Sequence, residues 1–429
     1  MSNQKFPIVL GVALVIISGM VSTPTPASAA DREKVLFAFK GLKDGFSPSS
    51  VIFDSAGNLY GTTFNGGDYH CDTYSGCGTV FKLEPGAQGQ WTKTVLHTFM
   101  GKDGAYPSPL ILDGAGSLYG TTVADGANGY GYGTVFKLSP SANGKWTETV
   151  LHRFNYKDGG LPSSSLIFDT AGNLYGTTPV GGAYGLGTVF KLVPDVKGRW
   201  NETVLHSFNG KDGDGPGSGL IFDSLGNLYG TTFAGGKTSY CSGNGCGTVF
   251  ELTPGTDGKW THTVLHSFSG EDGDVPSSSL VFDMAGNLYG TTELGGDLHS
   301  DTCLGDGCGV VFMLTTGANG SWTEQVLHRF HGWADGFYPT AALVFDMTGN
   351  LYGTTWYGGN VFKLAPGANG KWTETVLHTF KGKDGWFPYA GLVFDTSGNL
   401  YGTTDYGGKL NNCHSEFGNG CGVVFEITP

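Results

Sequence analysis

A histidine beside a carboxylate is the combination in this sequence that could support catalysis. His331 and His414 lie in glycine-containing segments near the C-terminal end, and Asp405 lies between them in the chain. Within hydrogen-bonding reach of one another, such groups permit general acid–base chemistry of a lyase or glycosidase type. Other polar residues that occur only once at their place in the sequence are His70, Glu293, His299 and Glu416. No nucleophile elbow, phosphate-binding loop or zinc-hydrolase motif is present, so catalysis is the second hypothesis.

A second set of chemically useful residues is aromatic. Trp333, Trp356 and Trp386 differ from the other six tryptophans, which recur at one fixed place in a repeated pattern. The same segments contain further rings, namely Phe337, Tyr338, Tyr357, Phe387, Tyr389 and Tyr406. Ring faces that remain exposed suit sugar rings, aromatic ligands or a protein partner. We therefore predict a ligand-binding surface, and the alternative is that these rings pack over the short segment 356–359.

The elements that must position these residues are seven copies of one module. Each copy contains Asp-x-x-Gly-(Asn/Ser)-Leu-Tyr-Gly-Thr-Thr, anchored at Asp54, Asp113, Asp169, Asp223, Asp283, Asp346 and Asp395. In the third copy the pattern predicts four short strands over residues 164–169, 174–178, 187–192 and 200–208, which we call strands a to d. This count and spacing predict an all-β, seven-bladed β-propeller with four-stranded antiparallel blades. In that fold the d-to-a and b-to-c loops emerge on one face, which brings the aromatic segments of blades six and seven together.

Ring closure is predicted from the two ends of the repeat array. Residues 34–39 resemble strand d, whereas the last copy ends on a strand c at residues 422–427. The N-terminal strand should therefore supply the fourth strand of the last blade, which removes the exposed edges of an open array.

Residues that recur in every copy are best explained by the construction of the blade. They include the histidine of strand d and the aspartate of each Asp-Gly-x-x-Pro segment, neither of which is needed six or seven times at one active centre. Calcium on these segments is disfavoured, because each offers one or two carboxylates and calcium takes six to eight oxygens. We expect no metal and no cofactor.

The ends and the composition indicate export. Residues 1–29 have the form of a signal peptide, with Lys5, an apolar stretch over residues 6–21 and Ala27-Ser28-Ala29 as the cleavage site. Residues 30–429 would form a single propeller domain, secreted or periplasmic, soluble, monomeric and without a membrane span. The formal net charge is −13 and no basic run occurs, which argues against a nucleic-acid partner.

The eight cysteines fall into four close pairs around glycine-rich segments, and no pair has the two-residue gap typical of zinc. An exported chain meets an oxidising compartment, so we predict four local disulfides. The pairs are Cys71 with Cys77, Cys241 with Cys246, Cys303 with Cys308 and Cys413 with Cys421.

The Gly-Asn-Leu-Tyr-Gly-Thr-Thr and Gly-Thr-Val-Phe-Lys-Leu-x-Pro signatures resemble those of the GloVer tandem-repeat family of exported bacterial proteins. The likeness extends over essentially the whole chain after the leader, and the Asp-x-x-Gly-Asn-Leu-Tyr core is similar, more weakly, to NHL-type propellers. The resemblance implies a fold and export but no established activity.

The first functional hypothesis is an exported ligand-binding or interaction propeller that uses the aromatic rim of blades six and seven. Its partner would be a carbohydrate, another cell-envelope component or an extracellular protein. The alternatives are a secreted enzyme that uses the same face and a purely structural module, and the fold alone does not decide among them.

Overall fold

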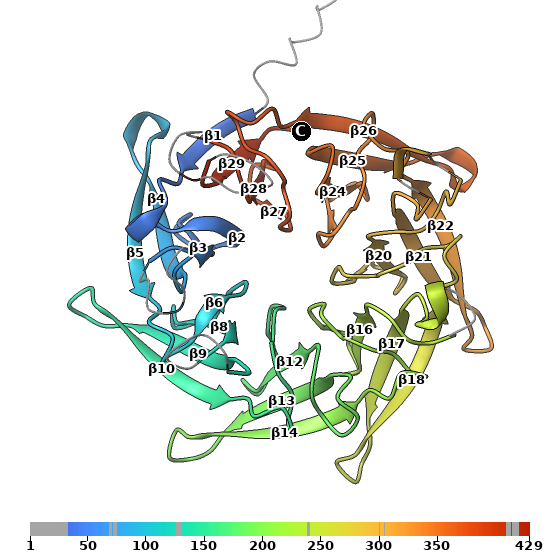
Figure 1. Ribbon diagram of the computed structural model, residues 1–429, viewed down its shortest axis with the longest axis horizontal. Helices are drawn as coiled ribbons and strands as arrows, with labels where there is room; N and C mark the ends of the chain where they lie inside the picture. The colour runs from blue at the N-terminus through green and yellow to red at the C-terminus, as the bar shows by residue number, and fades with distance from the viewer. Residues whose placement is uncertain are drawn as a thin grey trace, which may run out of the picture. The chain divides into compact units, whose positions relative to one another are not determined.

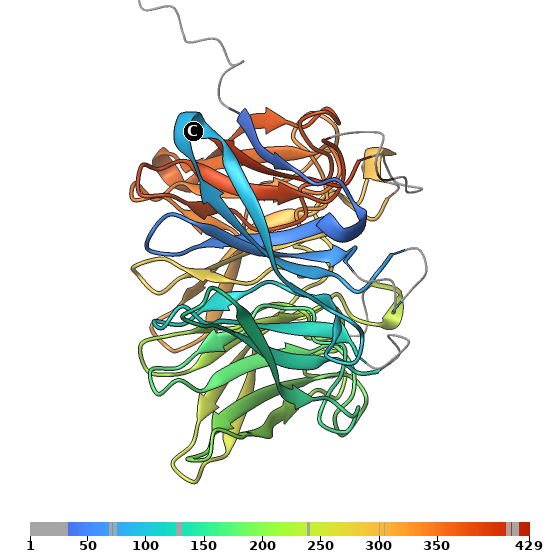
Figure 2. The same cartoon turned by 90° about the vertical axis from the view of Figure 1, so that its left-hand side faces the viewer.

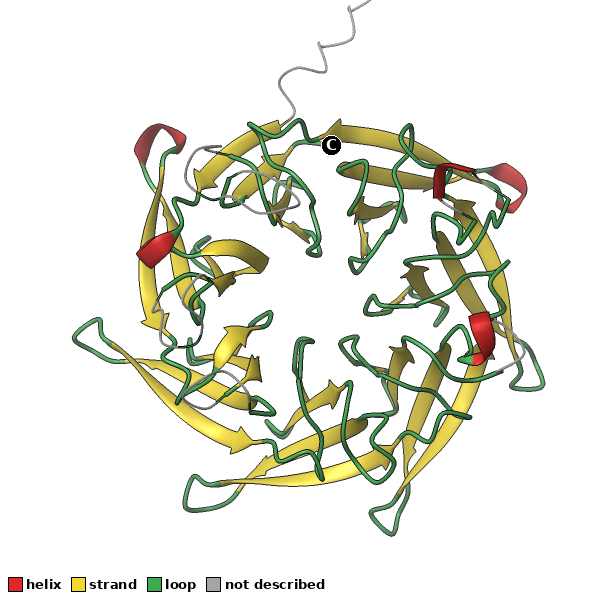
Figure 3. Ribbon diagram, viewed as in Figure 1, coloured by secondary structure: helices red, strands yellow, loops and turns green. Residues whose placement is uncertain are grey.

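The computed structural model describes residues 33–67, 71, 75–125, 131–237, 241–299, 301–303, 305–408, 413 and 420–429. The predicted leader over residues 1–29 lies outside these ranges. The described residues form seven antiparallel sheets around a common centre, the predicted seven-bladed β-propeller (Figure 1). Apart from single 3-10 turns, all regular structure in them is strand (Figure 3).

Each blade contains strands a, b, c and d from the centre of the ring outward. Blade one is β2 (Phe46–Phe53), β3 (Leu59–Asn65), β4 (Thr79–Pro85) and β5 (Trp91–Thr98). Blade two is β7 (Ile111–Leu112), preceded by β6 (Ala105–Pro107), then β8 (Leu118–Ala124), β9 (Thr134–Pro140) and β10 (Trp146–Arg153). Blade three is β11 (Ile167–Phe168), β12 (Leu174–Thr178), β13 (Thr188–Pro194) and β14 (Trp200–Ser207). Blade four is β15 (Ile221–Phe222), β16 (Leu228–Thr232), β17 (Thr248–Pro254) and β18 (Trp260–Ser267).

Blade five is β19 (Val281–Phe282), β20 (Leu288–Thr292), β21 (Val310–Thr316) and β22 (Trp322–Arg329). Blade six is β23 (Val344–Phe345), β24 (Leu351–Thr355), β25 (Asn360–Pro366) and β26 (Trp372–Thr379). Blade seven is β27 (Val393–Phe394), β28 (Leu400–Thr404), β29 (Val423–Ile427) and the N-terminal strand β1 (Glu33–Ala38). The 3-10 turns are η2 (Leu42–Asp44), η3 (Ala87–Gly89), η4 (Cys241–Gly243), η5 (Asp301–Cys303) and η6 (Ala368–Gly370).

The glycine of Leu-Tyr-Gly-Thr-Thr lies against a phenylalanine ring of the neighbouring strand. In each blade the strand-c phenylalanine, such as Phe190, is fully buried and covers the strand-b glycine. A Cβ on Gly176 would lie 2.7 Å from the Phe190 ring, and a Cβ on Gly402 would lie 2.6 Å from the Phe425 ring. Since real Cβ contacts are longer, any side chain at this position would displace the ring from the core.

Neighbouring blades are joined by the first threonine of each Gly-Thr-Thr. Its buried hydroxyl donates to a backbone carbonyl in the next blade, for example Thr177 Oγ1 to the Ser218 oxygen at 2.9 Å. The last of these bonds runs from Thr403 of blade seven to the Ser49 oxygen of blade one, at 3.0 Å. The threonine bonds therefore continue around the whole ring.

The N-terminal strand closes the ring as predicted. Strand β1 pairs antiparallel with β29, with Glu33 opposite Ile427 and Ala38 opposite Val423. The Phe39 amide also donates to the Gly422 oxygen at 3.0 Å. In Figure 1 the two ends of the described chain lie side by side in one blade.

Strand a is shorter than predicted. In the third copy the expected strand over residues 164–169 is reduced to β11, which has two residues. The preceding Ser164 is held by other contacts, because its carbonyl accepts from Thr121 of blade two and its hydroxyl bonds to Thr177. One side-chain hydrogen bond from blade two and one within blade three therefore replace the ladder that the sequence pattern predicts.

All four predicted disulfides are formed: Cys71–Cys77, Cys241–Cys246, Cys303–Cys308 and Cys413–Cys421. Structural disulfides are typical of extracellular and periplasmic proteins. Within the ranges that the structure describes, no helix has the length and apolarity needed to cross a membrane.

Deletion of residues 30–40 should open the ring. Strand β1 contributes five paired residues and the buried Leu36, and the chain beyond it contributes the buried Phe39. Burial of each such side chain stabilises by roughly 1.5–3 kcal/mol. We expect the melting temperature to fall by roughly 10 °C or more in differential scanning calorimetry. Lys34→Ala, at an exposed position of the same strand, serves as the control, and an unchanged melting temperature of the deletion would contradict the closure mechanism.

Candidate functional site

Two variable segments pair on one face of every blade. The first consists of the two residues between Asp-Gly and Pro, just before strand a. The second consists of the two residues that follow the Thr-Thr of strand b. In blade six Phe337 pairs with Tyr357, and in blade seven Trp386 pairs with Tyr406. We call this set of positions the loop face, and in the edge-on view of Figure 2 the d-to-a loops lie opposite the c-to-d hairpins. The same backbone arrangement, which we call the frame, therefore carries four variable side chains in each blade.

The residue before the proline of this frame has a left-handed backbone in every blade. The φ angle is 56° at Val275, 59° at Tyr338 and 58° at Phe387. Such a conformation costs roughly 1–3 kcal/mol for a residue other than glycine. A backbone hydrogen bond to the preceding blade holds the strained residue. In blade six the Tyr338 amide donates to the Cys308 carbonyl oxygen of blade five at 2.9 Å. The structure therefore maintains strain at the positions where the side chains vary.

Aromatic residues occupy seven of the eight loop-face positions in blades six and seven. They are Phe337, Tyr338, Trp356, Tyr357, Trp386, Phe387 and Tyr406, and the eighth position is Asp405. The other blades have fewer rings there, namely Phe46 and Phe64 in blade one, Tyr106 in blade two and Phe233 in blade four, and blades three and five have none. The concentration of rings in two adjacent blades is a property of side chains, because the backbone frame is the same throughout.

The structure brings all nine predicted aromatic residues into one connected cluster. Phe337 lies between Trp333 and Tyr357, with ring centroids 5.1 and 5.4 Å away. Tyr357 contacts Trp356 at 4.8 Å and Phe387 of blade seven at 5.1 Å. Further contacts join Tyr338 to Tyr357, Trp356 to Tyr389, and Phe387 to Trp386 and Tyr406, at 5.5–6.2 Å.

Exposure divides the cluster into a surface and a support. Trp333, Tyr389 and Trp386 are 72 %, 57 % and 44 % exposed. Phe337 and Phe387 are buried, so their rings pack within the cluster beneath the exposed ones. The other four rings are half-buried, and the indole nitrogen of Trp356 is buried without a hydrogen-bond partner among the described residues. We call the seven accessible rings the aromatic surface: Trp333, Tyr338, Trp356, Tyr357, Trp386, Tyr389 and Tyr406.

Of the predicted catalytic residues, the structure describes His331 and Asp405, and these two do not pair with each other. His331 is exposed, and its Nδ1 lies 3.9 Å from Asp297 Oδ2 of blade five. Asp405 turns to blade one, where Ser47 hydrogen-bonds its carboxyl group while burial raises its pKa. His414, with His70 and Glu416, lies outside the described residues. In the part of the chain that is described, no contact joins His331 to Asp405.

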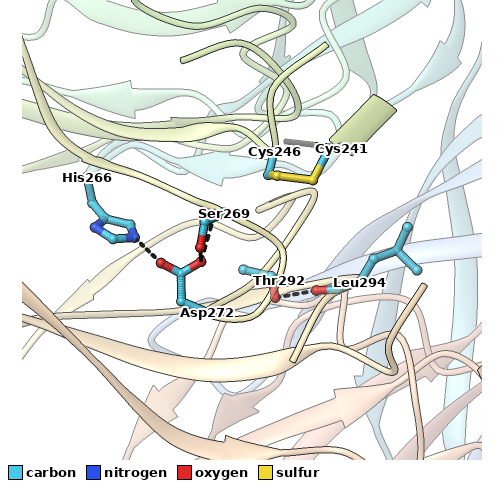
Figure 4. The surroundings of a disulfide bond; sticks show 7 residues. All are labelled: Cys241, Cys246, His266, Ser269, Asp272, Thr292 and Leu294. Atoms are coloured by element: carbon cyan, nitrogen blue, oxygen red, sulfur yellow. Dashed lines mark hydrogen bonds and ion pairs between the residues drawn. A yellow bond between two sulfur atoms is a disulfide. The ribbon is translucent and has the colours of Figure 1, made fainter. Parts of the chain in front are cut away.

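The recurrent histidines and aspartates form hydrogen-bonded pairs, as a scaffold role predicts. Nε2 of the strand-d histidine lies 2.9–3.2 Å from the aspartate of the following Asp-Gly in five blades, as for His266 and Asp272 in Figure 4. The pair of His328 and Asp335 is longer, at 3.4 Å. Each aspartate also accepts from a backbone amide of its own loop, for example Asp272 from Ser269. The pairs therefore shape the d-to-a loops.

A half-buried glutamate from the next blade approaches five of these pairs, a feature that sequence reasoning missed. The residues are Glu33, Glu148, Glu202, Glu324 and Glu374, each with one carboxylate oxygen buried and unpartnered among the described residues. Burial, and then the nearby aspartates, raise the pKa of these carboxyls to about 7. These glutamates recur at one position of strand d, so the sequence could have identified them as a set. Their contact with the histidine and aspartate of the neighbouring blade could be seen only in the structure.

The two exceptions to this pattern carry compensating residues. At the junction of blades seven and one, Phe37 of blade seven replaces the histidine and Lys93 of blade one replaces the glutamate, with Lys93 Nζ 3.0 Å from Asp44 Oδ1. At the junction of blades three and four, His262 replaces the glutamate and stacks on His206, with centroids 4.3 Å apart and planes 14° apart. His206, Asp212 and His262 are spaced for a metal, but face-to-face imidazoles do not direct both nitrogens at one ion, so the geometry favours packing.

Comparison with known proteins gives a family match and a fold. The model of the Gloeobacter/Verrucomicrobia repeat matches residues 15–242 and 197–415. No curated protein matches the sequence.

Among solved structures, the chain is similar to virginiamycin B lyase from Staphylococcus aureus, with 13 % identity, a TM-score of 0.53 and coverage of 92 % of this chain and 99 % of the lyase. A catalytically inactive form of that lyase with quinupristin gives a TM-score of 0.55 at 13 % identity, with 93 % and 99 % covered. PorZ, a bacterial surface component of the type-IX secretion system of Porphyromonas gingivalis, gives 0.50 at 14 % identity, with 91 % and 47 % covered. At these identities the likeness shows the fold alone.

Stability should depend on pH through the half-buried glutamates. A carboxyl whose pKa is raised by folding, from 4.5 to about 7, contributes stability that is complete below pH 4.5 and is lost as the pH rises through 7. We expect the melting temperature to be several degrees lower at pH 8 than at pH 5.5. In Glu148→Gln/Glu202→Gln/Glu324→Gln the difference should shrink. Glu271→Gln, at an exposed position, is the control, and an equal pH dependence in all three proteins would refute this origin.

Proposed function

Because this chain belongs to the Gloeobacter/Verrucomicrobia repeat family and is built as a seven-bladed propeller, we propose that it is an exported carbohydrate-binding protein. The binding site is the aromatic surface of blades six and seven. The predicted leader and the four disulfides support a secreted or periplasmic location.

The observation that carries this proposal is the exposure of rings that the fold does not require. Trp333, Trp386 and Tyr389 are the exposed rings of one connected cluster of nine, whereas other exposed rings such as Phe64, Tyr132 and Tyr156 contact a single neighbouring ring. Contiguous exposed apolar surface of this kind marks a binding site. Flat rings with polar edges fit the C–H faces of sugars, whose hydroxyl groups remain free for polar side chains.

A lyase or glycosidase using the same face is the competing function. It requires a proton donor and acceptor positioned on one substrate. His331 lies beside Asp297, while Asp405 bonds to Ser47 in another blade, so the geometry supports binding better than catalysis. The virginiamycin B lyase shares the fold at 13 % identity, which does not carry its activity over to this chain.

The binding role is tested by removing the two most exposed tryptophans. In Trp333→Ala/Trp386→Ala we expect glycan affinity to fall at least 30-fold, since a ring at the centre of an interface contributes roughly 2 kcal/mol. The melting temperature should change by less than about 2 °C, because neither ring is part of the buried core. The measurements are a glycan array, then isothermal titration calorimetry with the best ligand.

Tyr184→Ala provides the matched control, since Tyr184 is an exposed ring of blade three, 64 % accessible and outside the aromatic surface. This variant should keep full affinity. If the tryptophan variant binds normally but unfolds at a much lower temperature, the rings are structural and the proposed site is wrong.

A further inference from the structure

Acidic side chains border the aromatic surface on two sides. Toward blade five, the loop-face positions include Asp274 and Glu293, and Glu293 is the counterpart of Trp356 one blade earlier. Toward blade one, Asp405 is the counterpart of Trp356 one blade later. In blades five to seven the backbone amide of the residue after the Thr-Thr donates to the carbonyl of the strained residue before the proline. These bonds run from Glu293 to Val275, from Trp356 to Tyr338 and from Asp405 to Phe387. The frame thus places a carboxyl, an indole and a carboxyl side by side.

The carboxyl groups lie within electrostatic range of the rings. Burial, then Asp306 and then Glu293 raise the pKa of the Tyr338 hydroxyl. Burial, then Glu293 and then Asp405 raise the pKa of the Tyr389 hydroxyl, while more than half of Tyr389 remains exposed. Tyr389 therefore connects the two acidic sides of the surface.

These acids have no basic partner among the described residues. Asp274, Glu293 and Asp405 form none of the ion pairs found there, and burial raises the pKa of all three. The nearest loops carry His331, which pairs with Asp297, and the exposed Lys381 and Lys383. The border thus places carboxyl groups without an ion-pair partner beside open ring faces.

We propose that this acidic border selects sugars that carry a free amino group, an inference that rests on the proposed carbohydrate-binding function. An ammonium group is attracted by the faces of tryptophan and tyrosine and by carboxylates at the same time. A neutral sugar gains only the first kind of contact with its C–H faces. An acidic sugar is repelled by Glu293 and Asp405, so the border also excludes anionic glycans.

The test compares a glucosamine oligomer with its fully N-acetylated counterpart of the same length. Binding of both to the full chain is measured by isothermal titration calorimetry at pH 6, where the amino groups of the sugar are protonated. We expect the amine form to bind at least tenfold more tightly at 20 mM salt and to lose most of this advantage at 500 mM salt. Because this arm uses the unaltered protein, it does not depend on the folding of a variant.

Substitutions then assign the effect to the border. Glu293→Gln/Asp405→Asn should reduce the preference for the amine form to less than threefold. Asp214→Asn is the matched control, because Asp214 occupies the Asp274 position in blade four, away from the aromatic cluster. This control should retain the full preference.

The outcomes separate this inference from the proposed function. Equal affinity for the two oligomers, or tighter binding of the N-acetylated one, overturns the selection by the border but leaves carbohydrate binding intact. The same holds if neither oligomer binds and another glycan on the array does. Absence of binding to every glycan tested overturns the proposed function as well.

Discussion

A propeller blade can bury its two faces only between its two neighbours, and this constraint shapes the rest of the molecule. The strand-c phenylalanine of each blade is fully buried and lies directly on the strand-b glycine, so the sheet leaves no space for another side chain there. The first Gly-Thr-Thr threonine then donates its hydroxyl to the next blade. Because each blade depends on the next in this way, the array needs a closed ring, and β1 completes it in blade seven.

The same constraint separates positions that build the ring from positions that can carry function. Asp-Gly, proline, Gly-Thr-Thr and the paired glycines hold the loops in one conformation, including the left-handed residue before the proline. Between them remain the four loop-face side chains of each blade. Since these side chains lie on a fixed backbone, a binding surface can be formed by substitution alone, and rigid support reduces the entropy lost on binding. Blades six and seven use this freedom for aromatic rings.

The sequence was sufficient for the fold because the same signals recur seven times. The spacing of Asp54, Asp113 and their counterparts predicts the blades, and the orphan strand at residues 34–39 predicts the closure. The aromatic cluster was also predictable, since Trp333, Trp356 and Trp386 break the repeat. Three features were not: the short strand a, the burial of Phe337 and Phe387, and the half-buried glutamates beside the neighbouring blade's histidine. Each depends on a contact between blades, which sequence periodicity does not contain.

The loop face combines features that suit recognition more than chemistry. Catalysis by a histidine and a carboxylate requires both groups to act on one substrate, yet His331 and Asp405 have partners in different blades. The acids that have no basic partner among the described residues lie beside ring faces. Burial opposes the ionisation of these carboxyl groups, whereas a bound cation would favour their charged form. The cation would be stabilised by the carboxylates and by the faces of the rings at the same time. The electrostatics of the face therefore complement a ligand that brings its own positive charge, and the aromatic surface provides the apolar area against which such a ligand can lie.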